Sequence, residues 1–160
     1  MIQAILEGAD NVITQAPCCW LMTLSGGAVA ARPMGGVISS LSQTDWCLYF
    51  LVDVRSQKVR DIRSARQVHL IFQNGDDAFV SLAGVAEVIT DAGTMAQRWQ
   101  PSYDRIFPTA DERASAGFID IRADALRVWI RGLTPEPFGL RSLTLRRAPG
   151  GDWHSSSEGI

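Results

Sequence analysis

Two polar residues at the junction of a predicted strand and a predicted helix could bind an anion. Ser56 and Lys58 follow the apolar run 46–53 and open a short stretch in which Val59 and Ile62 fall on one helical face. The N-terminus of a helix presents unpaired N–H groups and the positive end of the helix dipole, and both attract anions. A serine hydroxyl and a lysine ammonium in the first turn would complete a phosphate site.

Lys58 is the only lysine in the chain; the other 14 of the 15 Lys and Arg residues are arginine. This bias favours a specific role for the ammonium group. The alternative is that Ser56 is an ordinary helix N-cap and Lys58 an ordinary surface charge. The segment alone leaves both interpretations open.

A second polar segment reads Ala-Arg-Pro-Met-Gly-Gly and spans residues 31–36. Proline donates no hydrogen bond to a sheet and is best tolerated on an edge strand, so Pro33 predicts exposed backbone beside Arg32. A polar ring or a phosphate could dock there. Alternatively, Arg32 and Pro33 protect an edge strand against unwanted pairing.

The cysteines and histidines do not form a recognisable metal or catalytic motif. No Cys-x-x-Cys occurs, and the two histidines are isolated, so we expect no metal site. Cys47 and His69 lie in apolar strand contexts, and core packing is the expected role of both. An odd number of cysteines predicts reduced thiols rather than a disulfide framework. Scattered carboxylates are expected on the surface; they are Asp111, Glu112, Asp120 and Asp124.

The elements that must position these residues are mostly strands. Helical spacing at the start of the chain predicts an amphipathic helix that ends before Pro17. Gly84, inside a long strand, predicts a β-bulge or a close approach of another part of the backbone. The expected strands cover 18–25, 28–39, 46–53, 67–74, 78–90, 117–123, 126–132 and 142–148. Further helices are expected over 56–65 and 92–100, with an irregular or weakly helical segment over 101–116.

Short turns between roughly six or seven strands favour a closed or nearly closed antiparallel barrel with helices packed outside. The class is therefore mainly β, of the α+β type. We expect one domain over 1–148 and a flexible tail over 149–160.

Charge and hydropathy exclude several classes of protein. The net charge of −2 and pI of about 5.6 argue against binding to nucleic acid or to an anionic membrane. No apolar run reaches the length of a membrane span. The first residues carry Glu7 and Asp10 and lack a basic start, unlike a signal peptide. A cytoplasmic location is therefore expected.

Taken together, the motifs occur in a specific order along the chain. They are a hairpin bearing ARPM, then LYFLVD, SQKV, VHLIF, FVSLAGVAEVITD, RWQPSYDRIFP and RVWI. This set, from Trp20 to Trp129, resembles the pyridoxamine 5′-phosphate oxidase-like FMN-binding split barrels, and among them the general stress protein subfamily. The resemblance implies a six- to seven-stranded split β-barrel.

The same resemblance implies the FMN contacts. Arg32, Ser56 and Lys58 would hold the flavin phosphate, and Pro33 and Met34 would lie along the isoalloxazine ring, partly through their backbone. Other residues would border the ring and ribityl chain through the backbone of one strand; these are Phe50, Leu51 and Val52. Trp99 matches a family tryptophan near the partner subunit, since such barrels are homodimers with flavin sites at the interface.

The resemblance leaves several functions open. One is an FMN-dependent oxidoreductase that takes electrons from a small-molecule donor, such as a reduced nicotinamide, and passes them to a small acceptor. Another is a non-catalytic flavin-binding or flavin-sensing stress protein, and a third is a split barrel that holds haem or a deazaflavin. Val52 and Ala83 stand where the family often has threonine and serine. The C-terminal Trp/Arg signature of true pyridoxamine phosphate oxidases is not evident in 127–142, so oxidation of pyridoxamine phosphate is not expected.

Overall fold

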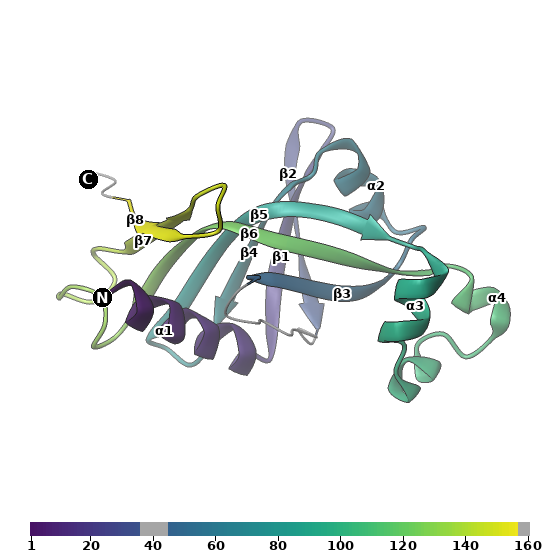
Figure 1. The fold of residues 1–160 in the computed structure, drawn as a ribbon, viewed down its shortest axis with the longest axis horizontal. Helices are drawn as coiled ribbons and strands as arrows, with labels where there is room; N and C mark the ends of the chain where they lie inside the picture. The colour runs from purple at the N-terminus through teal and green to yellow at the C-terminus, as the bar shows by residue number, and fades with distance from the viewer. Residues whose placement is uncertain (36–44, 157–160) are drawn as a thin grey trace.

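The computed structural model describes residues 1–35 and 45–156. Within them the chain forms eight strands and several short helices (Figure 1). In chain order these are α1 (Ile2–Gln15), β1 (Cys18–Ser25), β2 (Ala28–Gly35), β3 (Cys47–Asp53), α2 (Gln57–Ser64), β4 (Gln67–Gln73), β5 (Ala78–Ile89), α3 (Ala92–Arg98), a 3-10 helix (Pro101–Arg105), α4 (Ala110–Arg113), β6 (Ala116–Ile130), β7 (Leu143–Arg147) and β8 (Trp153–Ser155).

The strands form one antiparallel sheet in the order β2-β1-β4-β5-β6-β7-β8, and β3 also pairs with β6. The first part of β6 pairs with β3 and the last part pairs with β7. The sheet therefore divides into two branches along β6. Among the described residues no ladder joins β2 to β3, and the sheet is not closed. The predicted split β-barrel class is confirmed, with an open seam in the described part of the sheet.

A β-bulge interrupts the antiparallel pairing of β5 with β6. The register between these strands shifts at Ala83 and Gly84, as the sequence predicts. A Cβ atom at Gly84 would lie 2.3 Å from the carbonyl oxygen of Arg122, so a residue with a side chain does not fit at this position. The two strands predicted over 117–123 and 126–132 are one continuous strand, β6. The extra residue on β6 opposite Gly84 interrupts the alternation that a sequence pattern can detect.

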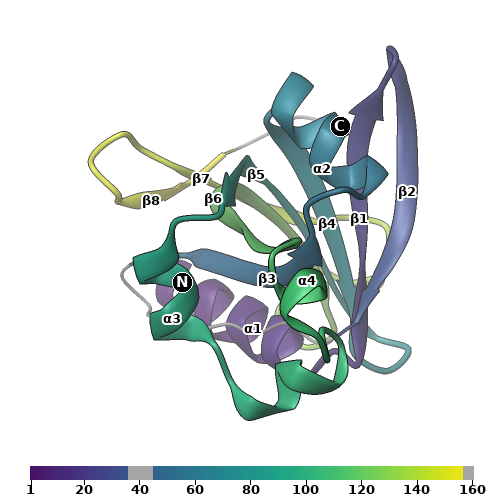
Figure 2. The ribbon, with the colours of Figure 1, turned by 90° about the vertical axis from the view of Figure 1, so that its right-hand side faces the viewer.

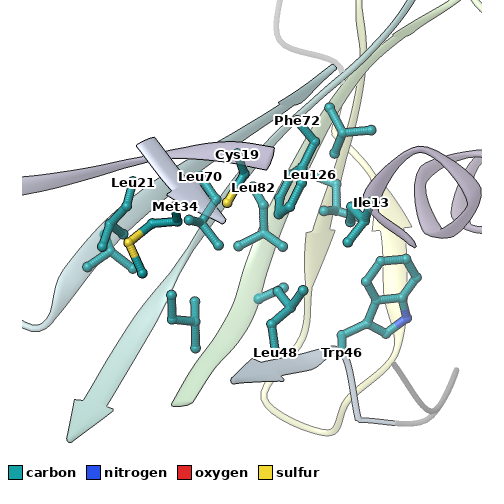
Figure 3. Close-up of a cluster of buried hydrophobic side chains, with 14 of the residues drawn as sticks. Ile13, Cys19, Leu21, Met34, Trp46, Leu48, Leu70, Phe72, Leu82 and Leu126 are labelled. Atoms are coloured by element: carbon teal, nitrogen blue, oxygen red, sulfur yellow. The ribbon is translucent and has the colours of Figure 1, made fainter. Parts of the chain in front are cut away.

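The core lies inside the curved sheet and is closed at one end by α1. Alternation on β4 places Val68, Leu70 and Phe72 inward. Figure 3 shows side chains from several strands meeting Ile13 of α1 in this cluster. Cys19 is fully buried in the same cluster, and this burial raises its thiol pKa to about 12. Cys18, in contrast, is exposed and Cys47 is half-buried, so Cys19 is the one fully buried cysteine of the three.

The C-terminal segment contains a short strand. Trp153–Ser155 forms β8, which pairs with β7 through residues such as Leu145 and Ser155. The ring of Trp153 also packs edge-on against Trp46, with centroids 5.4 Å apart. A short strand therefore lies within the segment for which the sequence predicts a flexible tail, and its aromatic contact comes from a distant part of the chain.

Within the described ranges, no helix is both long enough and apolar enough to cross a membrane. In the same part of the chain, no three His, Cys, Asp or Glu side chains are placed to share a metal ion. The last part of the predicted strand 28–39 lies outside the described residues.

Candidate functional site

The site begins with a tight turn between β3 and α2. The side chain of Asp53 accepts a hydrogen bond from the backbone N–H of Arg55 at 2.8 Å, and the guanidinium of Arg55 also donates to it. These hydrogen bonds lower the pKa of Asp53 to about 2. The backbone N–H of Ser56 then donates to the carbonyl of Asp53 at 3.0 Å. The turn therefore fixes where α2 starts.

Ser56 occupies the N-cap position of α2 with extended backbone, as predicted. Its hydroxyl, however, makes no capping hydrogen bond to the first turn. The Oγ atom is buried and has no hydrogen-bond partner among the described residues. A buried hydroxyl without a partner is unfavourable by about 1–3 kcal/mol, so a ligand that bonds to it gains from its presence.

Lys58 is half-buried in the first turn of α2, and it does not extend freely into solvent. Burial lowers its pKa, and the nearby positive charge of Arg32 lowers it further, while Asp53 acts in the opposite direction. Two cations close enough to affect one another mark a locally positive site. This geometry favours the anion-binding interpretation of Lys58 over the ordinary surface charge.

Arg32 reaches from β2 to α2. Its Nη2 lies 3.1 Å from Oδ2 of Asp61, and its Nη1 donates to Oγ1 of Thr23 at 2.8 Å. The same Thr23 hydroxyl donates to Oδ2 of Asp61 at 2.8 Å. Thr23 and Asp61 are almost fully buried, and the Arg32 side chain is 22% exposed. One side of the guanidinium is therefore anchored while part of it remains accessible.

Asp61 completes a network that the sequence analysis missed. Gln57 donates from Nε2 to its second oxygen, Oδ1, at 2.8 Å. Burial alone would raise the pKa of Asp61, but hydrogen bonds from Gln57, Thr23 and Ser25, together with the charge of Arg32, bring it below its usual value. The available signal was an aspartate next to Ile62 on the apolar face of a short helix, where a charged residue needs a buried partner.

Pro33 and Met34 point to opposite faces of β2. Pro33 is exposed, whereas the side chain of Met34 lies in the core beside Leu21 and Cys19 (Figure 3). Any contact of Met34 with a ligand outside the sheet must therefore be made through its backbone. The expected backbone contact is compatible with this orientation.

The predicted residues on β3 also offer mainly backbone. Phe50 and Val52 are buried in the core, and Leu51 is half-buried on the other face. β3 pairs with β6, and no other described strand pairs with it. Its second edge therefore presents backbone groups that a ligand can use.

Trp99 lies away from this cluster. It is the C-cap residue of α3, and its indole N–H donates to Asp104 at 2.9 Å. With Val54, Met95 and Arg113 it lines a cavity of about 380 Å³. Both views show α3 and α2 on different sides of β3 (Figures 1 and 2). The structure brings Arg32 near Lys58 at one end of α2, and it does not add Trp99 to that group.

The other side chains that the sequence analysis considered for catalysis do not come together in a second site. Cys47 pairs with Arg122 on β6, whereas His69 pairs with Ala83 on β5, so the two do not form a thiol–imidazole pair. The expected core packing is wrong for His69, which is exposed, and Cys47 is half-buried. Asp120 is bound by the guanidinium of Arg98. Asp111 and Glu112 are exposed on α4, and Asp124 is half-exposed on β6.

The cluster on α2 fits a phosphate group. Arg32 and Lys58 contribute two positive charges and Asp61 one negative charge, so the group is positive overall. A phosphate monoester carries about −1.5 to −2 charges at pH 7 and has three strong acceptor oxygens. The free Ser56 hydroxyl and the N–H groups at the start of α2 supply uncharged donors.

The fold is shared with solved structures. The General Stress Protein 26 from Bacillus anthracis str. Sterne is 21% identical, with a TM-score of 0.64 over 78% of this chain and 92% of that one. An FMN-binding protein related to pyridoxamine 5′-phosphate oxidase, from Nostoc punctiforme PCC 73102, is 15% identical, with a TM-score of 0.71 over 99% of this chain and 95% of that one. An F420 reductase is 19% identical, with a TM-score of 0.57 over 74% and 95% of the two chains.

Among curated proteins, no sequence matches the chain. The family model described as "Pyridoxamine 5′-phosphate oxidase like" matches residues 7–134. This match includes β1 to β6 and every residue of the α2 cluster. The chain therefore belongs to the pyridoxamine 5′-phosphate oxidase-like family.

Proposed function

We propose that the chain binds FMN and acts as a flavin-dependent oxidoreductase of the general stress protein type. The observation that carries this proposal is the buried Ser56 hydroxyl, which has no partner and belongs to the same helix turn as Lys58. Arg32 lies near enough to lower the pKa of Lys58. A hydroxyl and two cations form a suitable set of donors for the flavin phosphate.

The isoalloxazine ring would lie along the open edges of β2 and β3, near Pro33 and Leu51. Bound FMN would supply electron transfer, while the protein would supply binding and orientation. Arg32 and Lys58 would hold the phosphate, and the backbone of 33–34 and 50–52 would border the ring. The electron donor would be a small molecule, and neither nucleic acid nor a membrane is part of the proposal.

A homodimer with flavin sites at the interface is also proposed, and an exposed apolar patch supports it. Trp20 on β1 is 50% exposed and lies between Pro33 on β2 and Ile71 on β4, which is 40% exposed. Contiguous apolar surface of this kind is typical of an interface. A second copy would cover the patch and place Trp99 near its partner's flavin. A cytoplasmic location is consistent with the three free cysteines.

Two other functions have some support. The F420 reductase shares the fold, and a deazaflavin carrying a phosphate could use the same donors. A non-catalytic flavin binder is the second alternative, because Arg32, Ser56 and Lys58 would bind an anion and do not form an acid–base pair.

The decisive experiment is titration of the purified protein with FMN, followed by flavin fluorescence and visible absorption. We expect saturable binding at one FMN per chain and flavin absorption bands. A protein that does not bind FMN would contradict the proposal, and binding of F420 instead would favour the deazaflavin alternative. Anaerobic addition of NADH or NADPH to the FMN complex then separates the two flavin functions, because an oxidoreductase is bleached and a simple binder stays yellow.

A further inference from the structure

We propose that Asp61 is a positioning residue that gives the flavin site its preference for a phosphorylated flavin, because it anchors the guanidinium of Arg32. This inference rests on the proposed function. It names a buried residue that would touch no part of the ligand.

The contacts of Asp61 tie three elements together. Its Oδ2 accepts from Arg32 of β2 at 3.1 Å and from Thr23 of β1 at 2.8 Å. Its Oδ1 accepts from Gln57 of α2 at 2.8 Å. Both oxygens are therefore used, and the side chain is only 3% exposed. Such a carboxylate fixes its partners and has little capacity left to bind a ligand itself.

Arg32 keeps donors for a ligand after these contacts. A guanidinium has five N–H groups. One from Nη2 goes to Asp61 and one from Nη1 goes to Thr23, while the side chain remains 22% exposed. Without the anchor, a long arginine side chain would have to lose its rotamer freedom when the phosphate binds. Because Asp61 anchors Arg32, the side chain of Arg32 already loses this freedom when the protein folds. Phosphate binding then costs less conformational entropy.

Charge alone would predict the opposite effect of Asp61. The carboxylate reduces the positive charge of the site, so its removal should strengthen the attraction of a phosphate. However, Arg32 already lowers the pKa of Lys58, which means that the two cations repel one another in the free protein. Asp61 offsets this repulsion and holds Arg32 in a fixed place. For removal of the Asp61 charge, the positioning role therefore predicts weaker FMN binding, whereas charge alone predicts tighter FMN binding.

The test compares FMN with riboflavin, which has the same ring system but no phosphate. For Asp61→Asn we expect FMN affinity to fall by about 10-fold or more, as for the loss of a hydrogen bond to a charged group. Riboflavin affinity should change by less than about 3-fold, within the usual scatter of substitutions that contact nothing in the ligand. A control is Asp77→Asn, which makes the same change in an exposed Asp–Arg pair, with Arg131, and should leave both affinities unchanged.

A double-mutant cycle then tests whether Asp61 acts through Arg32. In an Arg32→Gln background, Asp61→Asn should cause no further loss of FMN affinity. Thr23→Val is the second variant if Asp61→Asn does not fold, because it keeps the carboxylate and removes the hydroxyl that holds Nη1. It should also lower FMN affinity without changing that of riboflavin.

Three results would overturn the inference: tighter FMN binding by Asp61→Asn, equal losses for FMN and riboflavin in a folded variant, or full additivity with Arg32→Gln. Circular dichroism and the melting temperature without ligand establish that each variant is folded. If the unmodified protein binds no flavin, the proposed function fails. If it prefers FMN and Asp61→Asn keeps that preference, only the role of Asp61 fails.

Discussion

Arg32 and Asp61 form an ion pair with an Nη2–Oδ2 distance of 3.1 Å, although 29 positions separate them in the chain. The pair joins the edge strand β2 to the helix that carries Lys58. Removal of one member of a buried ion pair is more damaging than replacement of both, because the remaining charge is left without a partner. Arg32→Ala therefore removes a proposed phosphate contact and also leaves Asp61 unpaired, so Lys58 is the cleaner residue for a first test.

Lys58→Ala should weaken FMN binding by about 1.5–3 kcal/mol, the contribution of a hydrogen bond to a charged group. Arg66→Ala is the matched control, because the Arg66 side chain is 61% exposed and is 3.9 Å from its partner Glu87. Fluorescence titration of both variants measures the difference. Equal FMN affinities would return Lys58 to the role of an ordinary surface charge.

FMN affinity should fall as the pH rises toward 10.5, the ordinary pKa of lysine. Burial and the charge of Arg32 lower the pKa of Lys58 in the free protein, and a bound phosphate would raise it again. Above the lowered value, binding must therefore take up a proton, at a cost of up to about 10-fold in affinity per pH unit.

Titrations between about pH 7 and 10 check this dependence, and the window follows from the ordinary pKa of lysine. Riboflavin is the control, because its ring titrates as that of FMN does but it has no phosphate. Lys58→Ala should lack the difference between the two ligands. A pH profile that is the same in this variant and in the unmodified protein would exclude Lys58 as the titrating group.

Trp20→Glu should convert the proposed dimer to monomers. Trp20 is half-exposed in one chain, so the substitution should not unfold it, whereas a buried unpaired charge in an interface costs about 3–5 kcal/mol. Light scattering measures the mass. Leu140→Glu is the control, since Leu140 is 71% exposed on the loop between β6 and β7. A monomeric unmodified protein with FMN bound would contradict the interface.

Gly84→Ala should destabilise the fold by about 1–3 kcal/mol, as is usual for overpacking. The new methyl group would meet the backbone of Arg122, with the carbonyl oxygen 2.3 Å away, and backbone cannot move aside as a flexible side chain can. Urea unfolding gives the free energy. Gly150→Ala is the control, because no atom lies within 4 Å of a Cβ atom built there. Equal stabilities would mean that the bulge relaxes easily.

Pyridoxamine 5′-phosphate should not be oxidised at a useful rate. A second phosphate would need its own cations, and one candidate of the C-terminal region, Arg131, is bound to Asp77 at 3.3 Å and stacked on Phe138. Arg141 is exposed on the same loop. Steady formation of pyridoxal phosphate by the FMN-loaded protein, lost in Arg131→Ala or Arg141→Ala, would show that this loop can form an oxidase site.

Local patterns were sufficient for much of the fold and for part of the site. The period of two on β4, the helix after Ser56 and the bulge at Gly84 depend on neighbouring residues, so the sequence predicts them. β8 and the Arg32–Asp61 pair depend on contacts between distant segments, such as the packing of Trp153 on Trp46. A sequence pattern contains no record of which buried carboxylate meets which arginine.

The pairing of β3 with β6 has a consequence for the order of folding. Between these two strands the chain makes α2, β4, β5 and α3, so β3 can find its partner only after a long loop has closed. Closure of such a loop costs conformational entropy before the contacts between β3 and β6 can offset that cost. The β4–β5 hairpin needs only local contacts. The turn that contains Ser56 follows β3 directly, so we expect the end of the molecule with the proposed FMN site to be among the last parts to assemble.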